Sequence, residues 1–165
     1  MGEYRLETDL DPEIERLRAD ILERRWAGEV LFFVRRIHAD RATSNRDIAD
    51  AFVAEVGCSG LGKHWLEIDR QEALWVLTRV LWGDICYDVS IMTRDEALNL
   101  AARFTSLFND CTFFTNGTWK KRVIPLPDPV DCLDGFWPIT QVTADTGVVA
   151  VGADRIGMLW VKDED

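Results

Sequence analysis

Apolar residues recur with helical spacing in four stretches of the chain. Asp11 suits an N-cap and Pro12 suits the first helical position, and the apolar residues of 12–23 then share one face. Capping-box patterns predict where three further helices begin: SNRD (44–47), DRQE (69–72) and TRDE (93–96). The first of these boxes is a loose one, because Asp47 stands where Glu is usual.

Two apolar runs between these helices are ambiguous. The run VLFFVRRI (30–37) is compatible with a continuation of the first helix past Gly28 or with a buried strand, and we favour the helix. The run ICYDVSIM (85–92) fits a short strand and a helical extension equally well, and both readings stay open.

From residue 111 the pattern changes to period two and to turn residues. Asn116-Gly117 lies between two β-prone runs and predicts a hairpin, since a type I′ turn needs positive φ at both central residues. Four of the five prolines fall in 125–138, which predicts an irregular loop. Three strand-like segments follow, separated by short turns at 145–147 and 152–154: ITQVTA (139–144), GVVAVG (147–152) and RIGMLWV (155–161).

These elements predict one α+β domain spanning residues 1–165. N-terminal helices would pack on a C-terminal antiparallel sheet, built from the hairpin and a three-stranded meander. Hydrophobic residues make up 47% of the 165 residues, and seven Trp and eight Phe supply large side chains for a core.

Composition also bears on the compartment. No apolar run approaches the roughly 20 residues that span a bilayer, and the acidic start of the chain lacks the basic and apolar segments of a secretory signal. We therefore expect a cytoplasmic protein. Its four cysteines are too far apart for a CxxC metal motif, and we expect free thiols.

The segment GCSGLGKH (57–64) resembles a phosphate-binding loop. Gly57, Gly62 and Lys63 fit the Walker A pattern, but His64 stands where a Ser or Thr hydroxyl should ligate Mg²⁺. The preceding segment has a helical pattern where a P-loop needs a strand, and the next helix begins only after Asp69. We interpret Gly57 as a helix C-cap and the segment as a connection between helices.

No other pattern indicates catalysis. His38 and His64 belong to no metal motif, and neither HExxH nor GxSxG is present. Asp128, Asp131 and Asp134 lack the alternation and terminal Glu of a calcium loop. We therefore expect a protein that is not an enzyme and that needs no cofactor and no metal.

The net charge of −10 is unevenly distributed. Residues 128–165 hold eight acidic and two basic residues, a balance of −6, whereas residues 71–127 are neutral. An acidic surface repels nucleic acid and anionic membranes and attracts basic proteins. The charge thus favours a basic protein partner, although solubility alone is an alternative explanation.

Aromatic residues beside acidic ones suit the recognition of a basic protein, because the rings provide desolvated contact area and the carboxylates steer Arg or Lys. The alternative is that Trp137 is buried under the loop and that the carboxylates are merely solvated. The candidate binding residues are Trp119, Asp128, Asp131, Asp134, Trp137, Asp163, Glu164 and Asp165.

A small acidic α+β protein without catalytic motifs, ending in GVVAVGADRIGMLWVKDED, resembles the immunity proteins encoded beside bacterial polymorphic toxins. The resemblance implies a protein that binds a cognate toxin domain and blocks its active site. Two other functions stay open: a nucleotide-binding protein or enzyme that uses Lys63, and a subunit held in a larger assembly by the apolar face around Trp75 and Trp82. The oligomeric state does not follow from the sequence.

Overall fold

A computed structural model describes residues 4–40, 42–86, 89–121, 127 and 131–163. Its centre is a six-stranded antiparallel sheet. In spatial order the strands are β1 (Tyr4–Thr8), β2 (Glu29–Ala39), β8 (Arg155–Asp163), β7 (Ala144–Gly152), β4 (Cys111–Thr115) and β3 (Leu66–Ile68).

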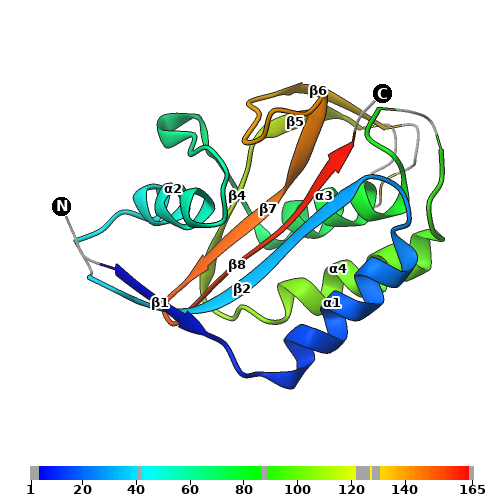
Figure 1. Ribbon diagram of the computed structural model, residues 1–165. Helices are drawn as coiled ribbons and strands as arrows, with labels where there is room; N and C mark the ends of the chain where they lie inside the picture. Colours follow the sequence, from blue (N-terminus) through cyan, green and yellow to red (C-terminus); the bar gives the residue numbers. More distant parts are fainter. Residues whose placement is uncertain (1–3, 41, 87–88, 122–126, 128–130, 164–165) are drawn as a thin grey trace.

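Helices cover both faces of this sheet (Figure 1). Three of them, α1 (Pro12–Arg24), α3 (Arg70–Trp82) and α4 (Arg94–Thr105), lie on one face, and α2 (Asn45–Glu55) lies on the other. Each face has its own core, the first containing Leu77, Phe104 and Leu159 and the second containing Phe52, Trp65 and Trp160. The predicted α+β class is therefore confirmed.

A separate two-stranded ribbon, β5 (Gly117–Lys120) and β6 (Cys132–Phe136), lies at one end of the large sheet (Figure 1). It is held to α3 by Trp119, whose ring meets Trp75 edge to face at a centroid distance of 5.6 Å. The ribbon positions the segment that follows it, which joins β6 to β7.

All four predicted helix starts are confirmed, because each capping side chain accepts a backbone hydrogen bond. The caps are Asp11 to the N–H of Glu13 (3.0 Å), Ser44 to Asp47 (3.1 Å), Asp69 to Glu72 (2.7 Å) and Thr93 to Glu96 (3.1 Å).

The preference for helix over 30–37 is wrong, since this run belongs to the long strand β2. Gly28 has φ of +69° and separates the run from α1. Phe32 and Val34 face the core under α1 and α4, whereas Leu31 and Phe33 pack against the other core. A strand that is apolar on both faces has no alternation, so its pattern could not distinguish it from a helix.

The hairpin predicted at Asn116-Gly117 is also wrong. β4 pairs with β3 and β7, while β5 pairs with β6, so the chain passes from the large sheet into the ribbon at Asn116. In the described part of the chain, positive φ occurs at Gly28, Gly57 and Gly62 and not at Gly117, so no type I′ turn forms there. Asn116 is instead fully buried.

The predicted meander is only partly present. The turn at 152–154 is confirmed between β7 and β8, but residues 139–143 form bends and not a strand. The predicted turn at 145–147 lies inside β7, because this segment pairs with β8; the Asp145 side chain accepts from the N–H of Ile139 and the indole of Trp160. Of the two middle strands of the sheet, β8 pairs with β2, from the N-terminal third, and β7 pairs with β4.

The run 85–92 forms neither of the two predicted elements in its described residues, which exclude 87 and 88. Gly83 and Ser90 form an isolated antiparallel bridge, and the N–H of Ile91 donates to the carbonyl of Trp82 at 2.7 Å. The segment therefore turns back on the end of α3 before α4 begins.

Candidate functional site

Trp137 combines an exposed ring with a fixed backbone. Half of the residue's surface is exposed to solvent, although it directly follows the ribbon. Its N–H donates to the carbonyl of Asn116 at 2.8 Å, and its own carbonyl accepts from Asn116 Nδ2 at 2.9 Å. One buried residue thus holds both backbone polar groups of Trp137.

A buried hydrogen-bond network fixes the residues behind Trp137. Oδ1 of Asp145 accepts from the indole of Trp160 at 3.0 Å and from the N–H of Ile139 at 3.1 Å. Oδ2 accepts from the N–H and the hydroxyl of Thr140 at 3.0 and 2.7 Å, and Asn116 Nδ2 donates to the Asp145 carbonyl at 2.8 Å. Because these groups are satisfied inside the protein, the connection to β7 has a defined path.

The ring of Trp137 stacks on the imidazole of His64, with centroids 3.9 Å apart and planes 18° from parallel. His64 ends the short 3₁₀ helix η1 (Gly62–His64), which follows α2 in the chain. The stacking limits the rotation of the indole. We call the exposed group formed by Trp137 and Pro138 together with Lys63 and the half-buried His64 the Trp137 surface.

Asp50 of α2 organises the segment that resembles a Walker A motif. Its carboxylate accepts from the N–H groups of Leu61 (2.8 Å) and Gly62 (3.1 Å) and from the indole of Trp65 (2.6 Å). These are N–H groups of the kind that a P-loop offers to a phosphate, and here an internal anion occupies them. The arrangement therefore does not support nucleotide binding by this segment.

The predicted role of Gly57 is confirmed. α2 ends at Glu55, and Gly57 follows with φ of +89°, a conformation that suits glycine after a helix. Lys63 is exposed and lies in η1, before Asp69 caps α3.

The other predicted binding residues do not join the Trp137 surface. Trp119 is half-buried, and the guanidinium of Arg79 lies 5.3 Å from its ring centroid. Asp131 is fully buried, and its carbonyl accepts from Arg79 Nε at 2.8 Å. Asp134 is exposed on the ribbon and pairs with Lys120 at 3.6 Å.

Asp163 lies in the interior at the end of β8. Its carboxylate pairs with the buried guanidinium of Arg25 at 2.9 Å and accepts from the N–H of Ile85 at 2.8 Å. Asp163 and Asp131 therefore present no charge at the surface. Asp128, Glu164 and Asp165 lie outside the described residues.

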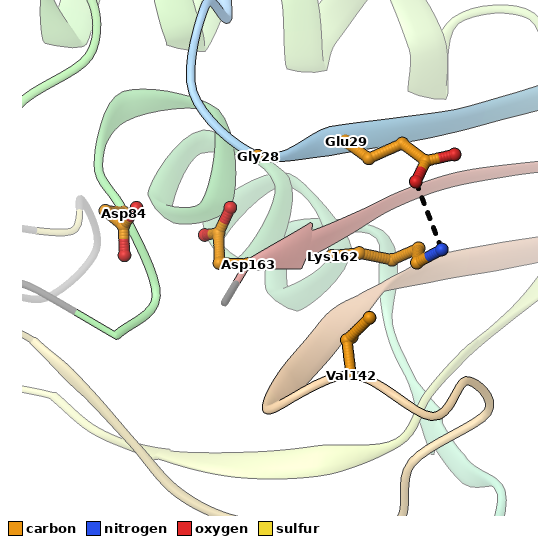
Figure 2. A pocket seen from close by; sticks show the side chains of 6 residues that line it. All are labelled: Gly28, Glu29, Asp84, Val142, Lys162 and Asp163. Atoms are coloured by element: carbon orange, nitrogen blue, oxygen red, sulfur yellow. Dashed lines mark hydrogen bonds and ion pairs between the residues drawn. The ribbon is translucent and has the colours of Figure 1, made fainter. Parts of the chain in front are cut away.

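A cavity of about 320 Å³ opens beside Asp163 (Figure 2). Its walls come from the start of β2, the end of β8, the segment after α3 and the connection before β7. At the cavity wall, Nζ of Lys162 donates to Oε2 of Glu29 at 3.1 Å (Figure 2). The lining residues are Gly28, Glu29, Asp84, Val142, Lys162 and Asp163.

Burial governs the electrostatics of several interior groups. Burial lowers the pKa of Arg79, although nearby Asp131 and Asp163 oppose the effect. Burial raises the pKa of the thiols of Cys58 and Cys111, which favours their uncharged form. Neither thiol has the lowered pKa that an activated nucleophile requires.

The described part of the chain brings no three His, Cys, Asp or Glu side chains together in a way that could hold a metal ion. Across the same described ranges, no helix has both the length and the apolar character needed to cross a membrane. Trp75 is buried against Trp119, so its ring is not available on an outer helical face for assembly.

Sequence reasoning missed two residues of the Trp137 surface and its support. His64 was noticed only as a mismatch to the Walker A pattern, and Asn116 only as a turn former. Nothing local to either residue indicates its contact with Trp137, because the partners are 73 and 21 positions away in the chain.

Comparisons of the chain with protein-family models, with curated proteins and with solved structures found no match.

Proposed function

We propose that this protein binds a protein partner through the Trp137 surface and neutralises it, as an immunity protein neutralises a bacterial toxin domain. The observation that carries the proposal is the exposed indole of Trp137, which Asn116 holds at the backbone and His64 holds at the ring. A preorganised aromatic side chain loses little conformational entropy on binding and buries a large apolar area.

The charge of the chain supports a basic partner. With a net charge of −10, the protein attracts cationic proteins over several ångströms and speeds their encounter. Asp131 and Asp163 were expected to be partner-binding residues, but both are buried and cannot contact a partner directly. The attraction would come from the whole surface, and the anchoring from Trp137.

In this proposal the chain acts in the bacterial cytoplasm by occluding the active site of its partner and performs no chemistry itself. Nucleotide binding through Lys63 has less support, since Asp50 already occupies the N–H groups of that segment.

The test is the kinetics of binding to the product of the neighbouring gene, measured by surface plasmon resonance. Trp137→Ala should weaken binding by about 2 kcal/mol or more, mainly through faster dissociation. Leu10→Ala is the matched control, because Leu10 is a highly exposed apolar residue outside the Trp137 surface. Association by the parent protein should slow steeply as salt rises.

The thermal unfolding midpoint of Trp137→Ala must first equal that of the parent. A loss of binding can then be attributed to the lost indole and not to unfolding. Equal dissociation rates for parent and Trp137→Ala would contradict the proposed anchor. In cells, co-expression of the parent should rescue growth against the toxin, and Trp137→Ala should rescue it less well.

A further inference from the structure

A second tryptophan, Trp26, is even more exposed than Trp137. It lies just after the end of α1, and 67% of its surface is open to solvent. Its indole N–H donates to the carbonyl of Ile91 at 3.0 Å, so the ring keeps one orientation. Val89, two residues before Ile91, is also exposed.

The turn that carries Trp26 is fixed from the inside. The buried side chain of Arg25 donates to the carbonyl of Val80 at 2.8 Å, to that of Ala27, and to the carboxylate of Asp163. Gly28 completes the turn with φ of +69°, and a side chain there would collide with Asp163. Trp26 is thus a rigidly mounted aromatic group, which is typical of binding anchors.

Acidic residues outnumber basic ones in the segments next to this turn. Glu23 lies in the last turn of α1 with a side chain that is 77% exposed, and it pairs with the partly exposed Arg24 at 3.9 Å. The end of α1 lies beside the start of α4, where Arg24 pairs with Glu96 at 3.3 Å and Asp95 is exposed. The N–H of half-buried Asp84 donates to the carbonyl of Val89 at 3.0 Å.

We propose that Trp26 anchors a second docking surface, which takes a basic segment of a partner protein. This Trp26 surface consists of Trp26, Val89, Glu23, Asp84 and Asp95. An apolar side chain of the partner would pack on the indole, and flanking Arg or Lys residues would meet the carboxylates.

The charge of this surface determines which occupant it fits. A second copy of the chain would bring one acidic surface against another, and like charges at an interface repel. An Arg- or Lys-rich segment has the complementary sign. The inference goes beyond the proposed function, because it requires neither Trp137 nor a toxin.

The Trp137 and Trp26 surfaces belong to different layers of the molecule. His64, on which Trp137 stacks, precedes Trp65 of the core under α2, whereas Trp26 follows α1, a helix on the opposite face of the sheet. A ligand of one surface can therefore be detected independently of the other.

The experiment titrates the whole protein with a synthetic peptide of alternating arginine and leucine, and follows the indole N–H signals by ¹⁵N NMR. The Trp26 signal should shift saturably, and Trp26→Ala should weaken binding at least tenfold. The double variant Glu23→Gln/Asp95→Asn should weaken binding several-fold and reduce its dependence on salt.

A charge-matched control uses Glu15→Gln/Asp47→Asn. Glu15 is as exposed as Glu23, lies on the same helix and also pairs with an arginine, and Asp47 lies in the first helical turn of α2 as Asp95 does in α4. This double variant should bind the peptide like the parent.

Three results would overturn the inference: no saturable shift of the Trp26 signal, equal losses in the two double variants, or a dimer in sedimentation that Trp26→Ala dissociates. A shift of the Trp137 signal alone is a case of the first result, and it would leave the proposed function standing. If the peptide shifts the Trp26 signal while Trp137→Ala binds the product of the neighbouring gene as tightly as the parent does, Trp137 is rejected as an anchor and Trp26 is retained.

Discussion

At the scale of single residues, the carboxylate of Asp50 sets the conformation and chemistry of the segment after α2. It sits among the N–H groups of Leu61 and Gly62 and the indole of Trp65. A phosphate at this place would meet occupied donors and a like charge. The segment 57–64 thus resembles a Walker A motif in sequence only, because its N–H groups bind an internal carboxylate.

This assignment predicts a large difference between two neighbouring substitutions. Asp50→Ala should lower the free energy of unfolding by about 1–3 kcal/mol, because it leaves three donors without their acceptor. Lys63→Ala, at an exposed position, should change it by less than about 0.5 kcal/mol. Urea denaturation of both variants measures the difference, and equal midpoints would show that Asp50 does not hold the segment.

At the scale of elements, the β5–β6 ribbon depends on a close approach at one of its two glycines. A Cβ at Gly117 would lie 2.5 Å from the carbonyl oxygen of Gly135 and 2.8 Å from Cβ of Phe136, whereas a Cβ at Gly135 would meet nothing within 4 Å. The need for glycine at position 117 therefore comes from packing and not from a turn.

Gly117→Ala should accordingly destabilise the protein by roughly 1–3 kcal/mol through overpacking. Gly135→Ala, in the partner strand, should cost far less. Thermal unfolding of the two variants tests this, and a Gly117→Ala protein as stable as the parent would mean that the ribbon can shift without cost.

The elements differ in how well the sequence predicts them, and the reason is the range of the interactions that define them. Helix starts at Asp11, Ser44, Asp69 and Thr93 were predictable because a cap and its N–H are two or three residues apart. The strand β2 was not, since its pairing with β1 and β8 and its two apolar faces are set by distant parts of the chain.

The candidate site was also only partly predictable from local sequence. Exposure of Trp137 was one of two alternatives in the sequence, and the structure favours it. The inward positions of Asp131 and Asp163 depend on Arg79 and Arg25, more than 50 and 130 residues away. Local composition therefore indicated an acidic patch where the fold buries two of its members.

At the scale of the whole molecule, Arg155 ties the start of β8 to the segment between β1 and α1. It donates to Asp9 at 2.7 Å and to Asp11 at 3.2 Å. Burial alone would raise the pKa of Asp9, but the hydrogen bonds and charge of Arg155 outweigh it and hold the pKa below its ordinary value.

This link predicts how stability depends on pH. Because the pKa of Asp9 is lowered on folding, its ionised form stabilises the protein above about pH 5, and the contribution is lost as pH falls below about 4. At pH 7 the parent should exceed Asp9→Asn in unfolding free energy by roughly 1–3 kcal/mol. The gap should close on acidification.

Urea unfolding at pH 7, 4 and 3 measures this gap. Asp110→Asn is the control, since Asp110 is exposed, and its difference from the parent should stay small throughout. A gap for Asp9→Asn that is the same at pH 3 and pH 7 would show that the ion pair does not contribute.

The position of β8 has a consequence for how the protein is made. This strand lies between β2 and β7 near the middle of the sheet, although it is the last of the sheet's strands in sequence order. During synthesis, β1 and β2 leave the ribosome more than a hundred residues before the strand that pairs with β2. The edge of β2 that pairs with β8 has no partner during that interval. A product that ends before residue 155 would lack the centre of its sheet. Completion of the sheet in the nascent chain thus depends on β8.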